Sequence, residues 1–166
     1  PVAEMLIPMA EYLNAQGRCA EATGPARRVA EGLEHAATED APTAFTAFDV
    51  YGTALRGVGR LDESKIWYCR ALRGRKRLSG EWDRASLASA NNLAGVVAAL
   101  GDDARSVRLY RRTYERYAAL LGQDHEDTVN AAGNLAGALL DLGRLDEAET
   151  LYADSAKAWS AKGEAG

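Results

Sequence analysis

The stretch GRLDEAETLY, residues 143–152, occurs in altered form at three earlier places in the chain. GRCAEATGPA lies at 17–26, GRLDESKIWY at 59–68 and GDDARSVRLY at 101–110, so the opening glycines are 42 residues apart each time. A fixed period of roughly 20 to 50 residues is typical of proteins that copy one structural unit along the chain. The sequence therefore predicts four copies of one unit.

Each unit has the pattern of two helices joined at a glycine. In the fourth copy, Leu135, Leu139 and Leu142 recur at three- and four-residue steps, which places them on one face of a first helix. Gly143 follows, and glycine readily adopts the left-handed conformation that ends many helices. A second helix is expected from about Leu145. Because a single pair of helices leaves its apolar faces open, neighbouring pairs are expected to stack.

Three features of these units carry expectations of their own. Tyr110 and Tyr152 share a register position and are expected to be largely buried between second helices. Asp103 stands where other copies have an apolar residue, and it must reach water or hydrogen-bond donors because an isolated buried carboxylate is costly. Asp124, three residues before Asp127, is expected to start the first helix of the fourth unit.

The composition is that of an ordinary folded chain. Its 166 residues are 47% apolar and 27% charged, which disfavours wholesale disorder. The net charge of −4 argues against affinity of the whole chain for nucleic acid. No apolar run has the length of a membrane span and no signal peptide opens the sequence, so a cytoplasmic location is expected. Cys19 and Cys69 lack metal-ligand spacing, and two thiols do not make a disulfide framework.

The sequence contains no recognisable catalytic motif. The segment RGVGRLD (56–62) lacks the third glycine of a dinucleotide-binding loop, and neither a phosphate loop nor a nucleophile elbow is present. The two histidines, His35 and His125, are far apart and belong to no metal-ligand motif. We therefore expect no enzyme activity, no cofactor and no bound metal.

Basic residues gather in the segment RALRGRKRL (70–78) and recur on the next predicted second helix. The recurring residues are Arg105, Arg108, Arg111, Arg112 and Arg116. One interpretation is a patch that binds nucleic acid or an acidic partner. The other is the solvated outer face of second helices, on which arginines pair with nearby acids. We favour the second because no interleaved exposed aromatics and no binding motif accompany the arginines.

The repeated pattern resembles the tetratricopeptide repeat. The small and large positions of that family are matched by Asn134, Leu135, Ala136, Leu139, Gly143, Leu145, Ala148 and Tyr152. The usual repeat has about 34 residues, whereas the 42-residue period and the segment LGQDHEDT (121–128) resemble the longer units of kinesin light chains and of many bacterial proteins. The resemblance implies an all-α fold, a right-handed superhelical solenoid of four helix-turn-helix repeats. We expect a single array over residues 1–166, with repeats at about 1–37, 42–79, 84–121 and 126–163.

The resemblance also implies a binding site for a protein or an extended peptide. In this family the first helices line a concave groove, and carrying those positions over by register selects Asp49, Thr53, Arg56, Asn91, Asn92, Gly95, Asn130, Asn134, Gly137 and Asp141. An amide both donates and accepts hydrogen bonds, which suits Asn92 and Asn134 to pairing with a peptide main chain. Their alternative role is bonding across adjacent helices.

The function expected from this resemblance is the sensor or scaffold part of a larger bacterial regulatory protein. In such chains a repeat array recognises a partner while a separate domain acts. Two alternatives stay open. One is a structural module that self-associates through the uncovered ends of the array, and the other is a nucleic-acid-associated module that uses the outer arginines.

Overall fold

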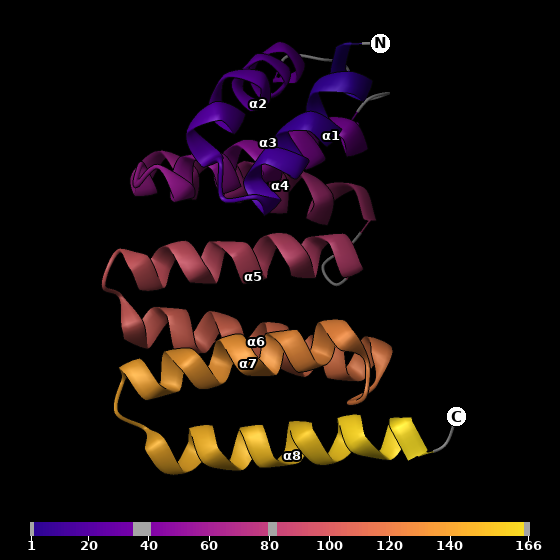
Figure 1. Cartoon of the computed structure of the whole chain (residues 1–166), viewed down its shortest axis with the longest axis vertical. Helices are drawn as coiled ribbons and strands as arrows, with labels where there is room; N and C mark the ends of the chain where they lie inside the picture. Colours follow the sequence, from indigo (N-terminus) through magenta and orange to yellow (C-terminus); the bar gives the residue numbers. More distant parts are fainter. Residues whose placement is uncertain (1, 35–40, 80–82, 165–166) are drawn as a thin grey trace. The chain divides into compact units, whose positions relative to one another are not determined.

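All regular structure in the described part of the chain is helical. The computed structural model describes residues 2–34, 41–79 and 83–164. The helices in these ranges are α1 (Val2–Ala15), α2 (Cys19–Leu33), α3 (Ala41–Gly57), α4 (Leu61–Ser79), α5 (Arg84–Ala99), α6 (Asp103–Leu121), α7 (Glu126–Asp141) and α8 (Leu145–Glu164). They follow one another along the chain as helix-turn-helix pairs (Figure 1). The predicted all-α fold of four helix-turn-helix repeats is confirmed.

A glycine corner joins the two helices of each pair. Gly17, Gly59, Gly101 and Gly143 have positive φ angles of 72°, 79°, 83° and 75°. In the fourth corner the Gly143 N–H donates to the Leu140 carbonyl at 2.9 Å and the Arg144 N–H to the Leu139 carbonyl at 2.8 Å. The equivalent two bonds form at the other three corners. This is the Schellman ending, in which a left-handed residue lets the last helical carbonyls find donors. The predicted breaks at these glycines are confirmed.

The third corner differs from the others in its charged residues. Asp102 replaces the arginine that follows the glycine elsewhere, and its carboxylate caps α6 by accepting from the Arg105 N–H at 3.2 Å. Asp103, the first residue of α6, is half-buried. Its carboxylate is therefore not sealed in the core, and the expectation that Asp103 keeps access to water or donors is confirmed.

The fourth repeat begins at a different residue from the expected one. α7 starts at Glu126, and His125 occupies the capping position, where its Nδ1 accepts from the Asp127 N–H at 3.1 Å. The prediction that Asp124 starts this helix is therefore wrong by one residue. The N–H groups in the first turn of a helix lack partners within the helix, and an imidazole nitrogen satisfies one of them as a carboxylate would.

The contacts divide the chain into two compact units, residues 1–96 and 97–166. In the first unit α1 packs on α2 and α3, and α3 also packs on α2 and α4. Phe48 and Tyr51 of α3 each have their ring centroid 5.2 Å from that of Trp67 on α4. A single array with the repeat bounds given above stays a prediction.

In the second unit α7 packs on both α6 and α8. Leu135 and Leu139 on α7 are each 1% exposed, as their spacing in the sequence predicts. Tyr117 of α6 and Ala148 of α8 are buried with them. The core of this unit is therefore built around the apolar stripe of α7.

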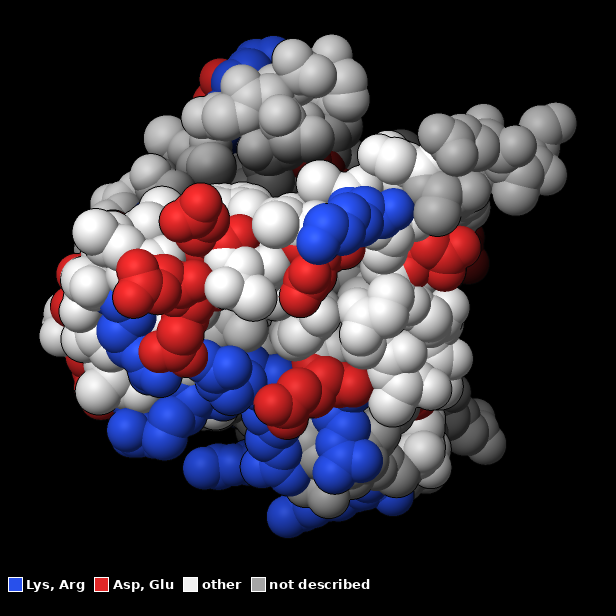
Figure 2. All heavy atoms as spheres, turned by 90° about the horizontal axis from the view of Figure 1, so that it is seen from below, with Lys and Arg blue, Asp and Glu red and all other residues white. Residues whose placement is uncertain are grey.

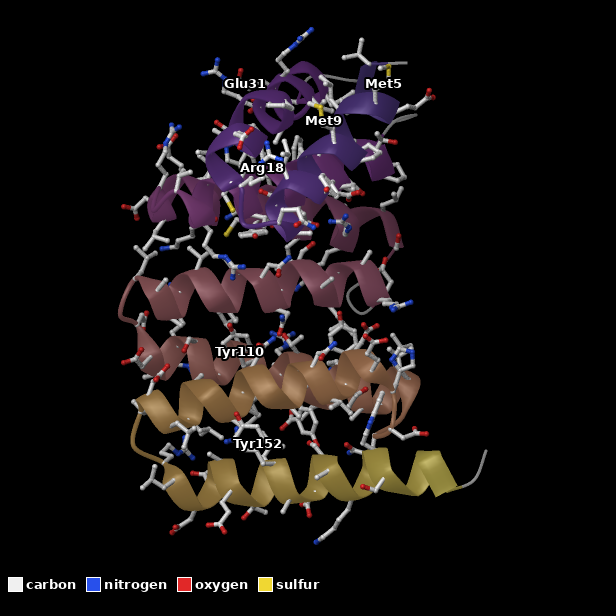
Figure 3. All side chains as sticks on the ribbon, in the orientation of Figure 1. Met5, Met9, Arg18, Glu31, Tyr110 and Tyr152 are labelled. Atoms are coloured by element: carbon white, nitrogen blue, oxygen red, sulfur yellow. The ribbon has the colours of Figure 1, made fainter. Side chains whose placement is uncertain are left out.

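The last helix is less buried than its register predicts. Tyr110 is 9% exposed and confirms the expected burial, but Tyr152 is 46% exposed, so its predicted burial is wrong. Both rings are labelled in Figure 3. α7 packs on the helix that carries Tyr110, whereas no helix follows α8 in the described ranges to cover Tyr152. The same register position is therefore buried on α6 and open on α8.

Candidate functional site

Asp49, expected to line the binding groove, belongs to a buried ion pair in the first unit. Its carboxylate Oδ2 on α3 accepts from Nη1 of Arg75 on α4 at 2.5 Å and from the hydroxyl of Ser89 on α5 at 2.9 Å. The Ser89 hydroxyl oxygen also accepts from Arg75 at 2.9 Å. The side chains of Asp49 and Arg75 are only 17% and 11% exposed. Charge-assisted bonds among these three residues therefore tie α3, α4 and α5 together.

The surroundings of the Asp49 carboxyl oppose its ionisation. Burial raises its pKa to about 6, although the Arg75 guanidinium and the Ser89 hydroxyl act to lower it. The other carboxyl oxygen, Oδ1, is buried and has no hydrogen-bond partner. The charge is thus only partly compensated by its neighbours.

This raised pKa predicts a pH-dependent contribution to stability. The folded chain binds a proton at Asp49 more readily than the unfolded chain, so protonation of Asp49 stabilises the fold. This contribution to the free energy of unfolding is full below the ordinary pKa of 3.8 and is lost as the pH rises through about 6. Between pH values of about 4 and 7, the free energy of unfolding relative to Asp49→Asn is expected to fall by about 2 kcal/mol. Urea unfolding of both proteins across this range measures the change. A difference that grows with pH would show that the pKa of Asp49 is lowered instead.

The other expected site residues of the first unit differ in their availability. Thr53 shares a 2.7 Å hydrogen bond with the Tyr68 hydroxyl and donates to the Asp49 carbonyl at 3.0 Å, so it acts within the fold. Arg56 is exposed at the end of α3. The expected site residues on α5 are all half-buried: Asn91, Asn92 and Gly95.

The expected site residues of the second unit all lie on α7, and with Gly133 they form a strip that we call the α7 strip. Asn130, Asn134 and Asp141 are exposed, and Gly133 and Gly137 are half-buried. Their spacing of three or four residues places them along one side of the helix. A Cβ atom added to either glycine would meet no other atom within 4 Å.

Packing explains several glycines of the first unit but not these two. A Cβ added at Gly52 would crowd the Tyr68 ring, one at Gly57 would crowd the Cys19 side chain, and one at Gly74 would crowd the Phe45 ring. Glycine inside a helix costs roughly 0.5–1 kcal/mol relative to alanine. In the α7 strip that cost is incurred at two positions where no neighbouring side chain requires it.

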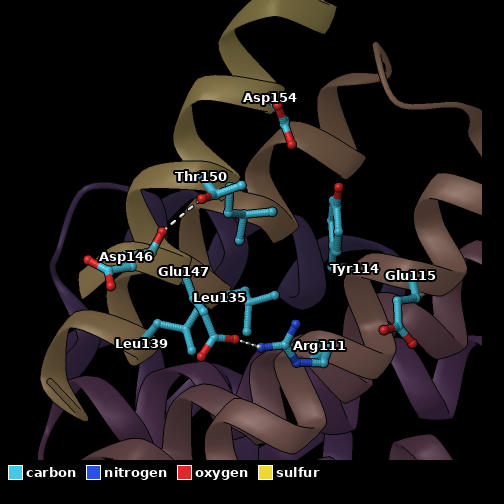
Figure 4. A pocket seen from close by; sticks show the side chains of 10 residues that line it. Arg111, Tyr114, Glu115, Leu135, Leu139, Asp146, Glu147, Thr150 and Asp154 are labelled. Carbon is cyan, nitrogen blue, oxygen red and sulfur yellow. Dashed lines mark hydrogen bonds and ion pairs between the residues drawn. The ribbon is translucent and has the colours of Figure 1, made fainter. Parts of the chain in front are cut away.

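A groove that the sequence did not predict is lined by side chains of α6, α7 and α8 (Figure 4). It has a volume of about 340 Å³. Leu135 and Leu139 line it from α7, and Arg111 at one side bonds to Glu147 at 3.0 Å. We call it the second-helix groove, because second helices form both of its sides.

The rim of the second-helix groove is acidic. Glu115 of α6 and Asp146 and Asp154 of α8 line it in addition to the Arg111–Glu147 pair, and all three are exposed. Asp146 and Asp154 are eight residues apart on one helix face, with Thr150 between them. That spacing is visible in the sequence, and it is the signal by which this rim could have been found.

Three arginines of the basic stretch and of the next second helix pair with acids, which agrees with the favoured interpretation of these residues. Arg70 bonds to Glu34 at 2.5 Å and lies 4.6 Å above the Trp67 ring. Arg75 is held by Asp49, and Arg111 by Glu147. Figure 2 shows both signs of charge side by side on the face that it presents. The two exposed pairs, Arg70–Glu34 and Arg111–Glu147, add little stability.

The described residues offer few groups for metal or redox chemistry. Within these ranges, no cluster of three or more His, Cys, Asp and Glu side chains is placed to hold a metal ion. Cys19 and Cys69 are half-buried and form no disulfide. His35 lies outside the described residues. None of the described helices is both long enough and apolar enough to cross a membrane.

Several solved structures share this fold at low sequence identity. BtubC (BKLC) from P. vanneervenii matches with a TM-score of 0.78 at 18% identity, over 93% of this chain and 62% of that one. Kinesin light chain TPR-like repeats of Podosopora anserina match at 0.80 and 18% identity, over 99% of this chain and 89% of theirs. A Rap protein complexed with Competence and Sporulation Factor matches at 0.81 and 17% identity, over 95% of this chain and 43% of its own. This chain therefore spans about three fifths of the length of BtubC.

A family model agrees with these structures. Residues 85–161 match the model described as tetratricopeptide repeat. No curated protein matches the sequence significantly. The expected resemblance to kinesin light chain repeats is confirmed at the level of the fold. Residues 85–161 therefore match the tetratricopeptide repeat, and the chain shares the fold of the TPR-like repeats in these solved structures.

Proposed function

We propose that the chain is a protein-binding module that holds an extended segment of a partner against the exposed faces of its first helices. The observation that carries the proposal is the α7 strip, where Gly133 and Gly137 lie beside the exposed Asn130 and Asn134. Packing within the chain does not require these glycines. A ligand main chain that passes close to the helix would require glycine at these two positions, because any larger side chain would keep the ligand away from the helix.

The asparagines supply the hydrogen bonds that such a ligand needs. An extended segment presents N–H and C=O groups in alternation, and one amide side chain can serve both kinds. Asn92 and Gly95 on α5 hold the register positions of Asn134 and Gly137 on α7. The first unit therefore carries on α5 the same combination of an amide and a glycine that the second unit carries on α7.

The similar structures support a role in recognition. The Rap protein is complexed with Competence and Sporulation Factor, so in that protein the fold accompanies binding of a separate factor. This chain covers 43% of the Rap chain and 62% of the BtubC chain, so similar arrays occur within longer proteins. We infer that this module is the recognition part of a larger bacterial regulatory protein and acts in the cytoplasm.

The glycines provide a test in which stability and binding change in opposite directions. The probe is a set of peptides selected on the wild-type chain from a displayed random library. Replacing Gly133 and Gly137 together by alanine is expected to raise the free energy of unfolding by about 1–2 kcal/mol. The same change is expected to weaken peptide binding, because two methyl groups occupy the space of the ligand main chain. Urea unfolding and calorimetry on the same protein measure both effects.

The asparagines provide the second test. Losing one neutral hydrogen bond costs about 0.5–1.5 kcal/mol, so the double variant Asn92→Ala, Asn134→Ala is expected to weaken peptide binding roughly ten- to a hundredfold. Arg73→Ala, an exposed change on α4, is the control and should leave affinity unchanged. Asp154→Lys reverses a charge in the second-helix groove. If that variant loses binding while the asparagine pair keeps it, the ligand sits in the second-helix groove and the proposal is wrong.

A further inference from the structure

We propose that the second-helix groove is a separate binding site, which takes a basic segment of a partner protein in extended form. In that segment two lysine or arginine residues are four positions apart and an apolar residue lies midway between them. The apolar side chain packs on the leucines of the groove, and the two cations meet the carboxylates of its rim. The inference does not rest on binding at the α7 strip, because the two sites share no residue.

The groove combines an apolar lining with charge around it. Leu135 and Leu139 line it from α7, and the half-buried Leu151 lines it from α8. Its volume of about 340 Å³ lies within the range of binding pockets, roughly 300–1,000 Å³, and accommodates a few side chains. The stems of lysine and arginine pack on apolar surface while their charged ends stay in water. Apolar and basic side chains therefore both suit this lining.

The rim carries negative charge that the fold does not use. Glu147 is accounted for, since it bonds to Arg111 at 3.0 Å and to Arg144 at 2.5 Å. Within the described ranges, the carboxylates of Glu115 and Asp146 form no ion pair. Asp154 has only Lys157 on its own helix, at 3.7 Å, and the two side chains are 65% and 79% exposed. Three rim carboxylates are thus accessible to a cationic partner.

The charge at Asp154 is opposite to that of its counterparts in the other repeats. At the same register position the first three repeats have an arginine, namely Arg28, Arg70 and Arg112. Arg70 uses its charge within the fold, because it bonds to Glu34 at the end of α2. The counterpart of Glu34 on α6 is Ala118, which offers Asp154 no opposite charge. Ion pairing between second helices therefore does not explain an aspartate at this position.

The spacing of the rim carboxylates favours an extended segment. Asp146 and Asp154 are eight residues apart on α8, with Thr150 midway between them (Figure 4). At a rise of about 1.5 Å per residue, they are about 12 Å apart along the helix axis. In an extended chain every second side chain points the same way, and four residues span about 13 Å. Two cations four residues apart therefore reach both carboxylates, and the side chain midway between them faces the groove.

Peptide selection tests the chemistry of the occupant. The probe is a displayed library of short random peptides, selected on a chain that carries Asn92→Ala and Asn134→Ala so that ligands of the first helices do not dominate. We expect the selected peptides to share two lysine or arginine residues four positions apart with an apolar residue midway. Selected peptides without this pattern, or the absence of any selected peptide, overturn the proposal. Because the α7 strip is already disabled, its own failure as a site leaves this result unchanged.

Charge reversal tests where these peptides bind. Asp146→Lys with Asp154→Lys is expected to weaken binding roughly ten- to a hundredfold, because two attractions become repulsions. Binding to the unreversed chain should also weaken when NaCl is raised from about 50 mM to about 500 mM, since salt screens exposed charges. Fluorescence anisotropy of a labelled peptide measures both effects. Affinity that survives the double reversal places the peptide elsewhere and overturns the proposal.

A matched control makes the same change of net charge outside the groove. Asp62 on α4 holds the register position of Asp146, and Glu149 on α8 lines a different hollow. Both residues are exposed. Asp62→Lys with Glu149→Lys is expected to keep the affinity within about threefold, because distant exposed charges are screened. An equal loss in the control and in the groove variant would assign the effect to net charge and overturn the site.

A third variant blocks the groove without removing a carboxylate. Thr150 is exposed, and its counterpart on α6 is Arg108, so an arginine is compatible with this position of the repeat. Thr150→Arg places a guanidinium beside the rim carboxylates and is expected to weaken peptide binding at least about tenfold. Circular dichroism of every variant verifies that the helices are intact. Unchanged affinity in a folded Thr150→Arg chain contradicts binding in the groove.

A charge swap tests direct contact with the rim. In a selected peptide, each of the two basic residues is replaced by glutamate in turn, and each product is measured against the Asp154→Lys chain and the unreversed chain. One of the two products is expected to bind the Asp154→Lys chain more tightly, because its glutamate then meets the new lysine. If both products prefer the unreversed chain, no cation of the peptide meets Asp154, and the proposed contact is wrong.

Discussion

Replacing Arg75 by methionine is expected to lower the free energy of unfolding by about 3–5 kcal/mol at neutral pH, the cost of leaving one member of a buried ion pair without its partner. Methionine keeps most of the side-chain volume but removes the guanidinium that bonds to Asp49 and Ser89. The Asp49 carboxylate would then be stranded among three helices with one oxygen already unpartnered. Urea unfolding of the variant and the wild type measures the loss.

Two further measurements identify the cause of that loss. Arg73→Met on the same helix changes an exposed residue and should alter stability by less than about 0.5 kcal/mol. Arg75 acts to lower the pKa of Asp49, so its removal raises that pKa further. Protonation then relieves the stranded charge, and the deficit of Arg75→Met should shrink as the pH is lowered from about 7.5 to about 5. A deficit independent of pH would show that lost packing, and not the stranded carboxylate, is responsible.

Tyr68→Ala is expected to destabilise the chain by about 3–5 kcal/mol, as truncation of a large buried aromatic residue does. The Tyr68 ring is 0% exposed, contacts Gly52 and shares a hydrogen bond with Thr53. Tyr152→Ala is the matched comparison, because Tyr152 holds the same register position but is 46% exposed. That change should cost about 1 kcal/mol or less in the isolated monomer.

The comparison is made by urea unfolding at a concentration where the chain is monomeric. Tyr68→Phe keeps the ring and removes only the hydroxyl, so it should lose about 0.5–1.5 kcal/mol. Equal losses for Tyr68→Ala and Tyr152→Ala would contradict the burial difference between the two rings.

The sequence predicted the helices and their corners because these are set by neighbours along the chain. The glycine at the corner of each helix pair, Gly143 in the last one, recurs every 42 residues. The left-handed conformation that it adopts ends a helix independently of the packing around that helix. The stripe of Leu135 and Leu139 likewise follows from helical periodicity alone. Register also marked Asn134 and Gly137 as equivalent to Asn92 and Gly95, although their roles as ligand contacts are still a prediction.

Only the tertiary structure decided which side chains are buried, paired or open to a partner. By register Asp49 falls among the positions expected to line the groove. In the structure it forms an ion pair with Arg75 and a hydrogen bond with Ser89, which lie 26 and 40 residues further along the chain. Tyr152 has the same register position as Tyr68, yet it is 46% exposed whereas Tyr68 is 0% exposed. The sequence by itself determined the repeated helical pairs, because hydrogen bonding and periodicity within a helix are local. Burial and ion pairing are non-local, since they depend on which surfaces the fold brings together.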